Sequence, residues 1–152
     1  MSLKQGSVDI KEKYLIARAR PKARQPFLDE INLAEYEPYV SRIKYLTPES
    51  LMHEITDSSG GAVSASLNPL QGIFGIKKIR SSILVTSNLF NIENENDFLG
   101  ILLHHEGDHA RQKFKRGRIR RKNRKLMEHL AFLNQLKHLT DMEYSDGYVQ
   151  SV

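Results

Sequence analysis

Compact apolar stretches in the middle of the chain predict short strands. Residues 79–86 form the strongest of them, because the stretch is short, apolar and rich in β-branched side chains. Residues 62–67 alternate small and apolar side chains, and another apolar run covers residues 73–76. A sheet of about three strands therefore fits residues 62–86.

Apolar residues at helical spacing predict helices on both sides of this sheet. Between residues 27 and 46 the spacing is partly helical and Pro38 interrupts it, which predicts a short helix and a second piece after it. Residues 95–115 predict one long helix, with Gly117 placed to end it. A last helix over residues 122–139 carries an apolar arc that is expected to face the core, with Glu128 at the edge of the arc; the arc consists of Leu130, Phe132, Leu133 and Leu136.

Length and composition narrow the classes of protein that fit. A chain of 152 residues predicts one α+β domain over residues 26–152, preceded by a basic N-terminal segment, residues 1–25, that is expected to be partly disordered. No apolar run approaches the roughly 18–20 residues of a membrane span, and the start of the chain has no hydrophobic signal core. These features predict a cytoplasmic protein with no membrane partner.

The chain has no cysteine. Disulfides, cysteine-based zinc fingers and thiol nucleophiles are therefore excluded. Any bound metal ion must be held by histidine, aspartate, glutamate or water.

The sequence His105-Glu106-Gly107-Asp108-His109 lies inside the predicted helix over residues 95–115. On a helix, residues four apart lie about 40° around the axis and roughly 6 Å along it, so both imidazoles can hold one metal ion with Glu106 beside them. This arrangement is typical of zinc hydrolases: zinc lowers the pKa of a bound water towards about 7, and the carboxylate takes the proton of that water as it attacks a carbonyl. The pattern predicts a small Zn²⁺-dependent peptidase.

This region resembles the zincin metallopeptidases, and among them the gluzincins, whose third zinc ligand is a glutamate on a following helix. Glu128 follows His109 by 19 residues, and Glu128 with Ala131 resembles the Glu-x-x-Ala pattern that accompanies this ligand. The resemblance covers residues 62–139 and implies a zincin-like α+β fold, with a small mixed sheet, an active-site helix and a following C-terminal helix. It also implies zinc ligands His105, His109 and Glu128, Glu106 as general base, a peptide or protein substrate, and an edge strand over residues 79–86 that pairs with substrate.

The chain departs from the zincin pattern at two positions and leaves two assignments open. Gly107 costs about 1 kcal/mol in a helix relative to alanine and stands where the family usually has a bulky apolar residue, and Asp108 is unusual so near the metal. Other candidates for the third ligand are His129, Asp141 and His138, although His129 falls inside the predicted apolar arc, where a core histidine is the commoner outcome. Candidates for the residue that stabilises the oxyanion are Tyr144, Tyr148, His138 and Arg111.

Residues 111–125 contain ten lysines or arginines and no acidic residue. The positive charges in so dense a block repel one another unless they are solvated by water or paired with carboxylates or a polyanion. The stretch is therefore either a solvated junction between helices or a contact to the phosphates of a nucleic acid, which would be independent of sequence and sensitive to salt. The second interpretation gives the alternative to a peptidase: a basic nucleic-acid-binding or scaffold protein with an inactive zincin-like fold.

Overall fold

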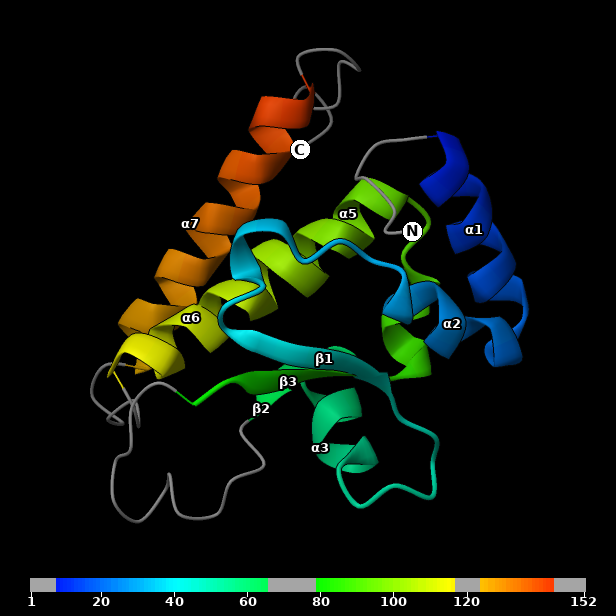
Figure 1. Cartoon of the computed structure of the whole chain (residues 1–152), viewed down its shortest axis with the longest axis horizontal. Helices are drawn as coiled ribbons and strands as arrows, with labels where there is room; N and C mark the ends of the chain where they lie inside the picture. Colours follow the sequence, from blue (N-terminus) through cyan, green and yellow to red (C-terminus); the bar gives the residue numbers. More distant parts are fainter. Residues whose placement is uncertain (1–7, 66–78, 117–123, 144–152) are drawn as a thin grey trace.

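Helices lie on both faces of a small sheet in the structure, a computed structural model that describes residues 8–65, 79–116 and 124–143. Figure 1 shows the rod formed by α5 (Glu95–Leu99) and α6 (Glu106–Arg116) above the sheet and α3 (His53–Ser58) below it. The helix α7 (Arg124–Glu143) lies beside the rod. The predicted α+β class with a small sheet is confirmed at this level.

The sheet has three strands in the order β1 (Val40–Tyr45), β3 (Ser81–Val85) and β2 (Ala62–Ala65). β1 runs parallel to β3, and β2 runs antiparallel to it. The strands predicted near residues 62–67 and 79–86 are therefore present, but the prediction that residues 79–86 form an edge strand is wrong. The strand β3 lies in the centre of the sheet, between β1 and β2, and all its residues are buried. In the described part of the chain, β2 is an edge strand and contacts α6. The apolar run at residues 73–76 lies outside the described residues.

Residues 40–45 form β1, whereas the sequence shows partly helical spacing there and predicts only a second piece of unspecified type after Pro38. The pairing register of β1 with β3 shifts between Val40 and Arg42, as it does at a β-bulge. An extra residue in a strand places side chains three apart on the same face, so Val40 and Ile43 are both buried. Buried residues three positions apart are also typical of a helix, so the sequence pattern of Val40 and Ile43 does not distinguish a bulged strand from a helix.

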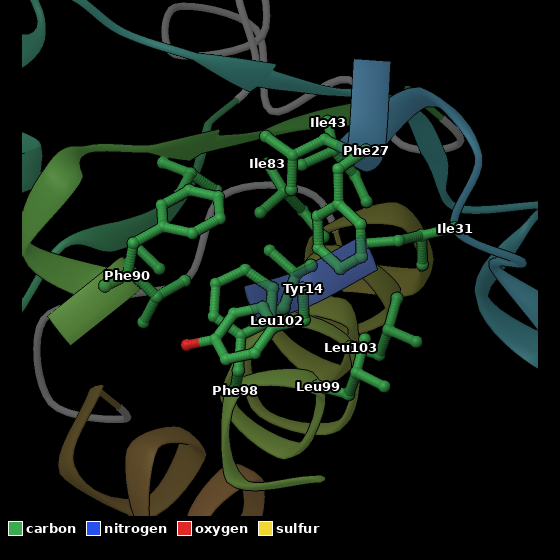
Figure 2. Packing of buried hydrophobic residues seen from close by; sticks show 14 of the residues in the cluster. Tyr14, Phe27, Ile31, Ile43, Ile83, Phe90, Phe98, Leu99, Leu102 and Leu103 are labelled. Carbon is green, nitrogen blue, oxygen red and sulfur yellow. The ribbon is translucent and has the colours of Figure 1, made fainter. Parts of the chain in front are cut away.

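The core is built around aromatic rings from distant parts of the chain (Figure 2). Tyr14 lies 4.6 Å from Phe98 and 5.8 Å from Phe27 between ring centroids, and Phe90 lies 4.9 Å from Phe98. Tyr14 belongs to α1 (Val8–Ala19) and donates a hydrogen bond to the carbonyl of Ile92. The N-terminal segment, residues 1–25, thus contributes the fully buried side chain of Tyr14 to the domain core. The helices α2 (Arg24–Asp29) and α5 contribute to the same core.

The helix predicted over residues 95–115 is present and runs from Glu95 to Arg116. The side chain of Asn94 caps its start by accepting hydrogen bonds from the backbone N–H groups of Asn96 and Asp97, at 2.8 and 3.2 Å. A π-helical segment, Gly100–His105, joins α5 to α6 and buries Leu102 and Leu103. Such wide turns are frequent at functional sites, and this one ends at His105, the first of the two histidines that are predicted to bind a metal. Gly117, its predicted end, lies outside the described residues.

The predicted C-terminal helix is also present, but it buries a different face from the one predicted. Met127 and Ala131 are buried, whereas Leu126, Leu130, Phe132 and Leu133 remain 41–53% exposed. The small side chain of Ala131 lets α7 approach the π-helical segment closely, and Asn134 secures the contact by donating to the hydroxyl of Tyr36 and the carbonyl of His104, each at 2.8 Å. Within the described ranges, no helix is both long and apolar enough to cross a membrane.

Candidate metal centre

Two histidines of the rod and one glutamate of α7 meet at the surface between these elements. The Nε2 atom of His105 lies 2.5 Å from Oε1 of Glu128, and the Nε2 atom of His109 lies 2.8 Å from Oε2 of the same carboxylate. One potential ligand atom from each residue falls within 4.8 Å of the others. The histidine side chains are 14% exposed and Glu128 is 61% exposed, so the group is open to solvent on the side of α7.

The secondary structure explains why these three side chains converge. His105 and His109 are one helical turn apart, and their ring centroids are separated by 5.0 Å. Glu128 belongs to the first two turns of α7 and lies between the buried residues Met127 and Ala131 in the sequence. Packing of α7 against the π-helical segment therefore brings Glu128 to the two rings.

The charges at the group suit a cation. Burial would by itself raise the pKa of Glu128, but the two imidazoles outweigh this effect and hold the pKa of the carboxyl below its usual range. A neutral imidazole nitrogen with a free lone pair repels a carboxylate oxygen at these distances, so the contacts are favourable only with a proton or a metal ion between them. Two imidazoles and one carboxylate are a frequent set of protein ligands in catalytic zinc sites, which leave a fourth position for water or substrate.

Glu106 lies against the edge strand β2. Glu106 is only 6% exposed. Burial, together with repulsion from Glu128, raises the pKa of Glu106 to about 8. Lys113 and a hydrogen bond from the Ser64 backbone act in the opposite direction. Within the described part of the chain, the Oε2 atom of Glu106 is buried with no hydrogen-bond partner. The carboxyl therefore has a free acceptor and, with no metal ion beside it, a pKa above its usual range.

Lys113 lies two turns beyond Glu106 on the same helix and also reaches β2. Its Nζ donates to the carbonyl of Ser64 and lies 3.2 Å from the Ser64 hydroxyl. Desolvation lowers the pKa of Lys113, while the nearby Glu106 opposes that shift. Glu106, Lys113 and Ser64 thus form a polar group that joins α6 to the edge of the sheet.

The two unusual residues of the metal-binding pattern have structural roles. A Cβ atom at Gly107 would lie 2.8 Å from Cγ of Tyr36, so the Tyr36 ring fills the space that a larger residue would need. The carboxylate of Asp108 is buried and bonded to two neighbours on α6: it pairs with Arg111 and accepts a hydrogen bond from Gln112 at 3.1 Å. Neither residue displaces a candidate ligand.

The remaining candidates from the sequence do not join the group. His129 is exposed and is not part of the group that could hold a metal ion among the described residues. Arg111, a candidate for the oxyanion, pairs with Asp108 and lies over the ring of Tyr36 at 5.9 Å. The side chains of the other candidates lie outside the described residues; these are His138, Asp141, Tyr144 and Tyr148.

The basic stretch, residues 111–125, is only partly directed toward solvent. Arg111 and Lys113 are engaged with Asp108 and Ser64 inside the protein. Lys115 is exposed and lies over the ring of Tyr39 at 5.8 Å. Residues 117–123 lie outside the described residues. Among the described residues of this stretch, Arg111, Lys113 and Lys115 thus have contacts within the protein.

Sequence reasoning did not identify Ser64, Lys113 or Gln112 as part of the site. Gln112 accepts or donates at three points around the group, including a 3.1 Å contact with Nδ1 of His109. The helical spacing contained a usable signal, because Gln112 is three residues from His109 and Lys113 is seven from Glu106. No such signal existed for Ser64, which approaches α6 only through the folding of the sheet.

Comparison with known proteins gives no relative: no protein-family model, no curated protein and no solved structure matches the chain.

Proposed function

We propose that the protein is a zinc-dependent metallopeptidase with a zincin-like active site. One observation carries the proposal: the Nε2 atoms of His105 and His109 face the two oxygens of Glu128, while the buried carboxyl of Glu106 lies next to them. In this proposal His105, His109 and Glu128 hold a Zn²⁺ ion. A bound zinc ion supplies a water whose pKa falls to about 7 and polarises the carbonyl of the substrate.

The residues of the chain then have distinct tasks. Glu106 takes the proton from the attacking water while the water oxygen forms a bond to the carbonyl carbon of the peptide. Glu106 next gives this proton to the nitrogen of the leaving amine, the carbon–nitrogen bond breaks, and a carboxylic acid and an amine are released; the acid then loses its proton to the amine or to solvent.

The edge position of β2 supports an extended peptide as the substrate. In antiparallel and parallel sheets alike, an edge strand offers backbone groups to which another strand can add. β2 lies beside α6, and Ser64 on β2 already contacts Glu106 and Lys113. The backbone groups of Ser64 are already bonded to Glu106 and Lys113, so a peptide would pair with other residues of β2 and pass close to the proposed general base.

Replacing Glu106 by glutamine tests the proposal. The test uses zinc-loaded full-length protein, fluorescein-labelled denatured casein and a panel of internally quenched peptides. We expect the wild type to cleave at least one of these probes, and Glu106→Gln to retain about one zinc per chain and lose at least 100-fold in rate. His105→Ala, as the matched control, should lose both the zinc and the cleavage.

Two results would contradict the proposal in different ways. If Glu106→Gln cleaves at the wild-type rate, Glu106 is not the base and this mechanism is wrong. If the wild type binds zinc and cleaves nothing, the inactive scaffold becomes the better interpretation. Salt-dependent binding of fluorescein-labelled single-stranded DNA, equal in the wild type and Glu106→Gln, would then favour the nucleic-acid-binding alternative.

A further inference from the structure

We propose that Gln112 is a positioning residue that fixes the ring of His109 and ties it to the backbone beside Glu128. The inference rests on the proposed metal site and concerns how the chain holds two of its three ligands. Gln112 lies on α6, one turn beyond His109, and is buried. Its amide group contacts three partners: His109, Asp108 and the carbonyl of Met127.

The partners determine which way the amide points. Its nitrogen lies 3.1 Å from Oδ2 of Asp108 and 3.2 Å from the carbonyl oxygen of Met127. A carboxylate oxygen and a carbonyl oxygen can only accept hydrogen bonds, so the NH₂ group of Gln112 must face both of them. The opposite orientation would place the amide oxygen against two acceptors. The oxygen of Gln112 therefore faces His109.

This orientation determines the tautomer of His109. The amide oxygen lies 3.1 Å from Nδ1 of His109 and can only accept, so Nδ1 must carry the hydrogen. In the neutral ring the other nitrogen, Nε2, then has a free lone pair, and that lone pair faces Oε2 of Glu128 at 2.8 Å. Without a metal ion, the 2.8 Å contact needs a proton between Nε2 and Oε2. Gln112 thus fixes the ring of His109 with Nε2 toward the proposed metal position, where an ion takes the place of that proton. Metal-binding histidines commonly need such a partner on the second ring nitrogen.

The second contact of the amide acts on α7. Met127 directly precedes Glu128, and its carbonyl accepts from Gln112. Asp108 anchors the same amide, and Arg111 in turn pairs with Asp108. One side chain of α6 therefore restrains both the ring of His109 and the backbone that carries the carboxylate ligand.

The other histidine of the group has no comparable support among the described residues. The Nδ1 atom of His105 is buried without a hydrogen-bond partner in that part of the chain. The tautomer of His105 is therefore not fixed by a neighbour in the way that Gln112 fixes His109. This asymmetry makes Gln112 the side chain whose loss should weaken metal binding most without removing a ligand.

Gln112→Met tests the inference, because methionine has a similar length but cannot donate, and its sulfur accepts only weakly. Lys115→Met is the matched control: it makes the same replacement on the same helix at an exposed residue outside the network. Zinc affinity is measured by competition with a fluorescent chelator. We expect Gln112→Met to bind zinc 10- to 100-fold more weakly, and Lys115→Met to bind as the wild type does.

A second test follows the proton of the His109 ring in the zinc-loaded wild type and in Gln112→Met. In two-bond ¹H–¹⁵N spectra of the zinc-loaded protein, we expect the ring of His109 to carry its proton on Nδ1, protected from exchange by Gln112. A proton on Nε2 would overturn the inference. So would an Nδ1 proton that exchanges equally fast in the wild type and in Gln112→Met.

Failure of this inference and failure of the proposed function can be distinguished. If the wild type and Gln112→Met bind zinc equally well, the role of Gln112 is wrong while the peptidase proposal is unaffected. If the wild type binds no zinc, both fail. If Gln112→Met binds zinc weakly but the metal-free variant unfolds at the same urea concentration as the wild type, the loss is one of ligand positioning rather than of general stability.

Discussion

Gly107 leaves room for Tyr36 in the middle of the metal-binding pattern. A Cβ atom there would lie 2.8 and 2.9 Å from two carbons of the Tyr36 ring, which is itself buried. Gly107→Ala should therefore destabilise the protein by about 1–3 kcal/mol through overpacking, although alanine favours a helix by about 1 kcal/mol over glycine. Urea unfolding of the two proteins measures the difference.

The double substitution separates these two effects. In a Tyr36→Ala background the ring is gone, so Gly107→Ala should become stabilising by about 1 kcal/mol, the helix preference alone. If Gly107→Ala costs the same in both backgrounds, contact with Tyr36 is not the reason for the glycine.

Glu106 should make the stability of the metal-free protein depend on pH. The folded pKa is raised to about 8, above the value of about 4.3 that is typical of an unfolded chain. The folded state then binds the proton more tightly, so stability is greatest below the unfolded pKa and is lost as the pH rises toward 8. Between these values the loss approaches about 1.4 kcal/mol per pH unit, and above 8 it levels off.

Urea unfolding of wild type and Glu106→Gln from pH 4 to pH 9, with a chelator present, isolates this contribution. The difference in unfolding free energy between the two proteins should shift steadily in favour of the variant as the pH rises. A difference that stays constant over this range would mean that burial does not perturb Glu106.

At the scale of elements, a helix or strand could be predicted where its capping residues, apolar run and residue spacing all indicate the same structure. The rod over residues 95–116 has a capping residue, Asn94, a continuous apolar run and two histidines at helical spacing, so its position could be read from the residues. The strand β1 could not be predicted in this way, because its bulge gives the buried residues Val40 and Ile43 the spacing of a helix. The buried face of α7 was missed for another reason: the helix has more large apolar residues than it buries, and a close approach selects the small Ala131.

The packing of α7 gives a prediction about the metal site. Ala131 is fully buried on the helix that carries Glu128, so Ala131→Leu should push α7 away from the π-helical segment. We expect a loss of stability of about 1–3 kcal/mol and weaker zinc binding, because Glu128 moves with the helix. Leu130→Ala, on the exposed face of the same helix, should change stability by no more than about 0.5 kcal/mol.

Thermal unfolding and chelator competition on both variants measure these effects. If Leu130→Ala destabilises more than Ala131→Leu, the apolar arc inferred from the sequence is the packed face after all. Equal zinc affinity in Ala131→Leu and the wild type would show that the position of Glu128 does not depend on this contact.

On the scale of the whole molecule, the proposed metal ion would join α6 to α7 across residues 117–123 of the chain. A ligand that binds only the folded state stabilises it, by about 2.7 kcal/mol when its concentration is 100 times its Kd. Zinc should therefore raise the Tm of the wild type progressively with its concentration. Calorimetry at several zinc concentrations measures this effect.

Glu128→Gln is the control, since it keeps the size of the side chain and removes the charge. Its Tm should respond far less to zinc than that of the wild type. An equal rise in both proteins would indicate that zinc binds elsewhere, for example to unmatched acidic groups on the surface.

The strand order has a consequence for how the chain acquires its shape during synthesis. β1 and β2 both pair with β3 and not with each other, although both precede it in the chain. Neither can therefore enter the sheet until residue 85 has left the ribosome, and β1 waits while about 40 further residues are added. The ligands follow in the same direction, with the two histidines first and Glu128 last. A nascent chain that has reached α6 thus already has the sheet and two of the proposed ligands, but it cannot yet complete the metal site.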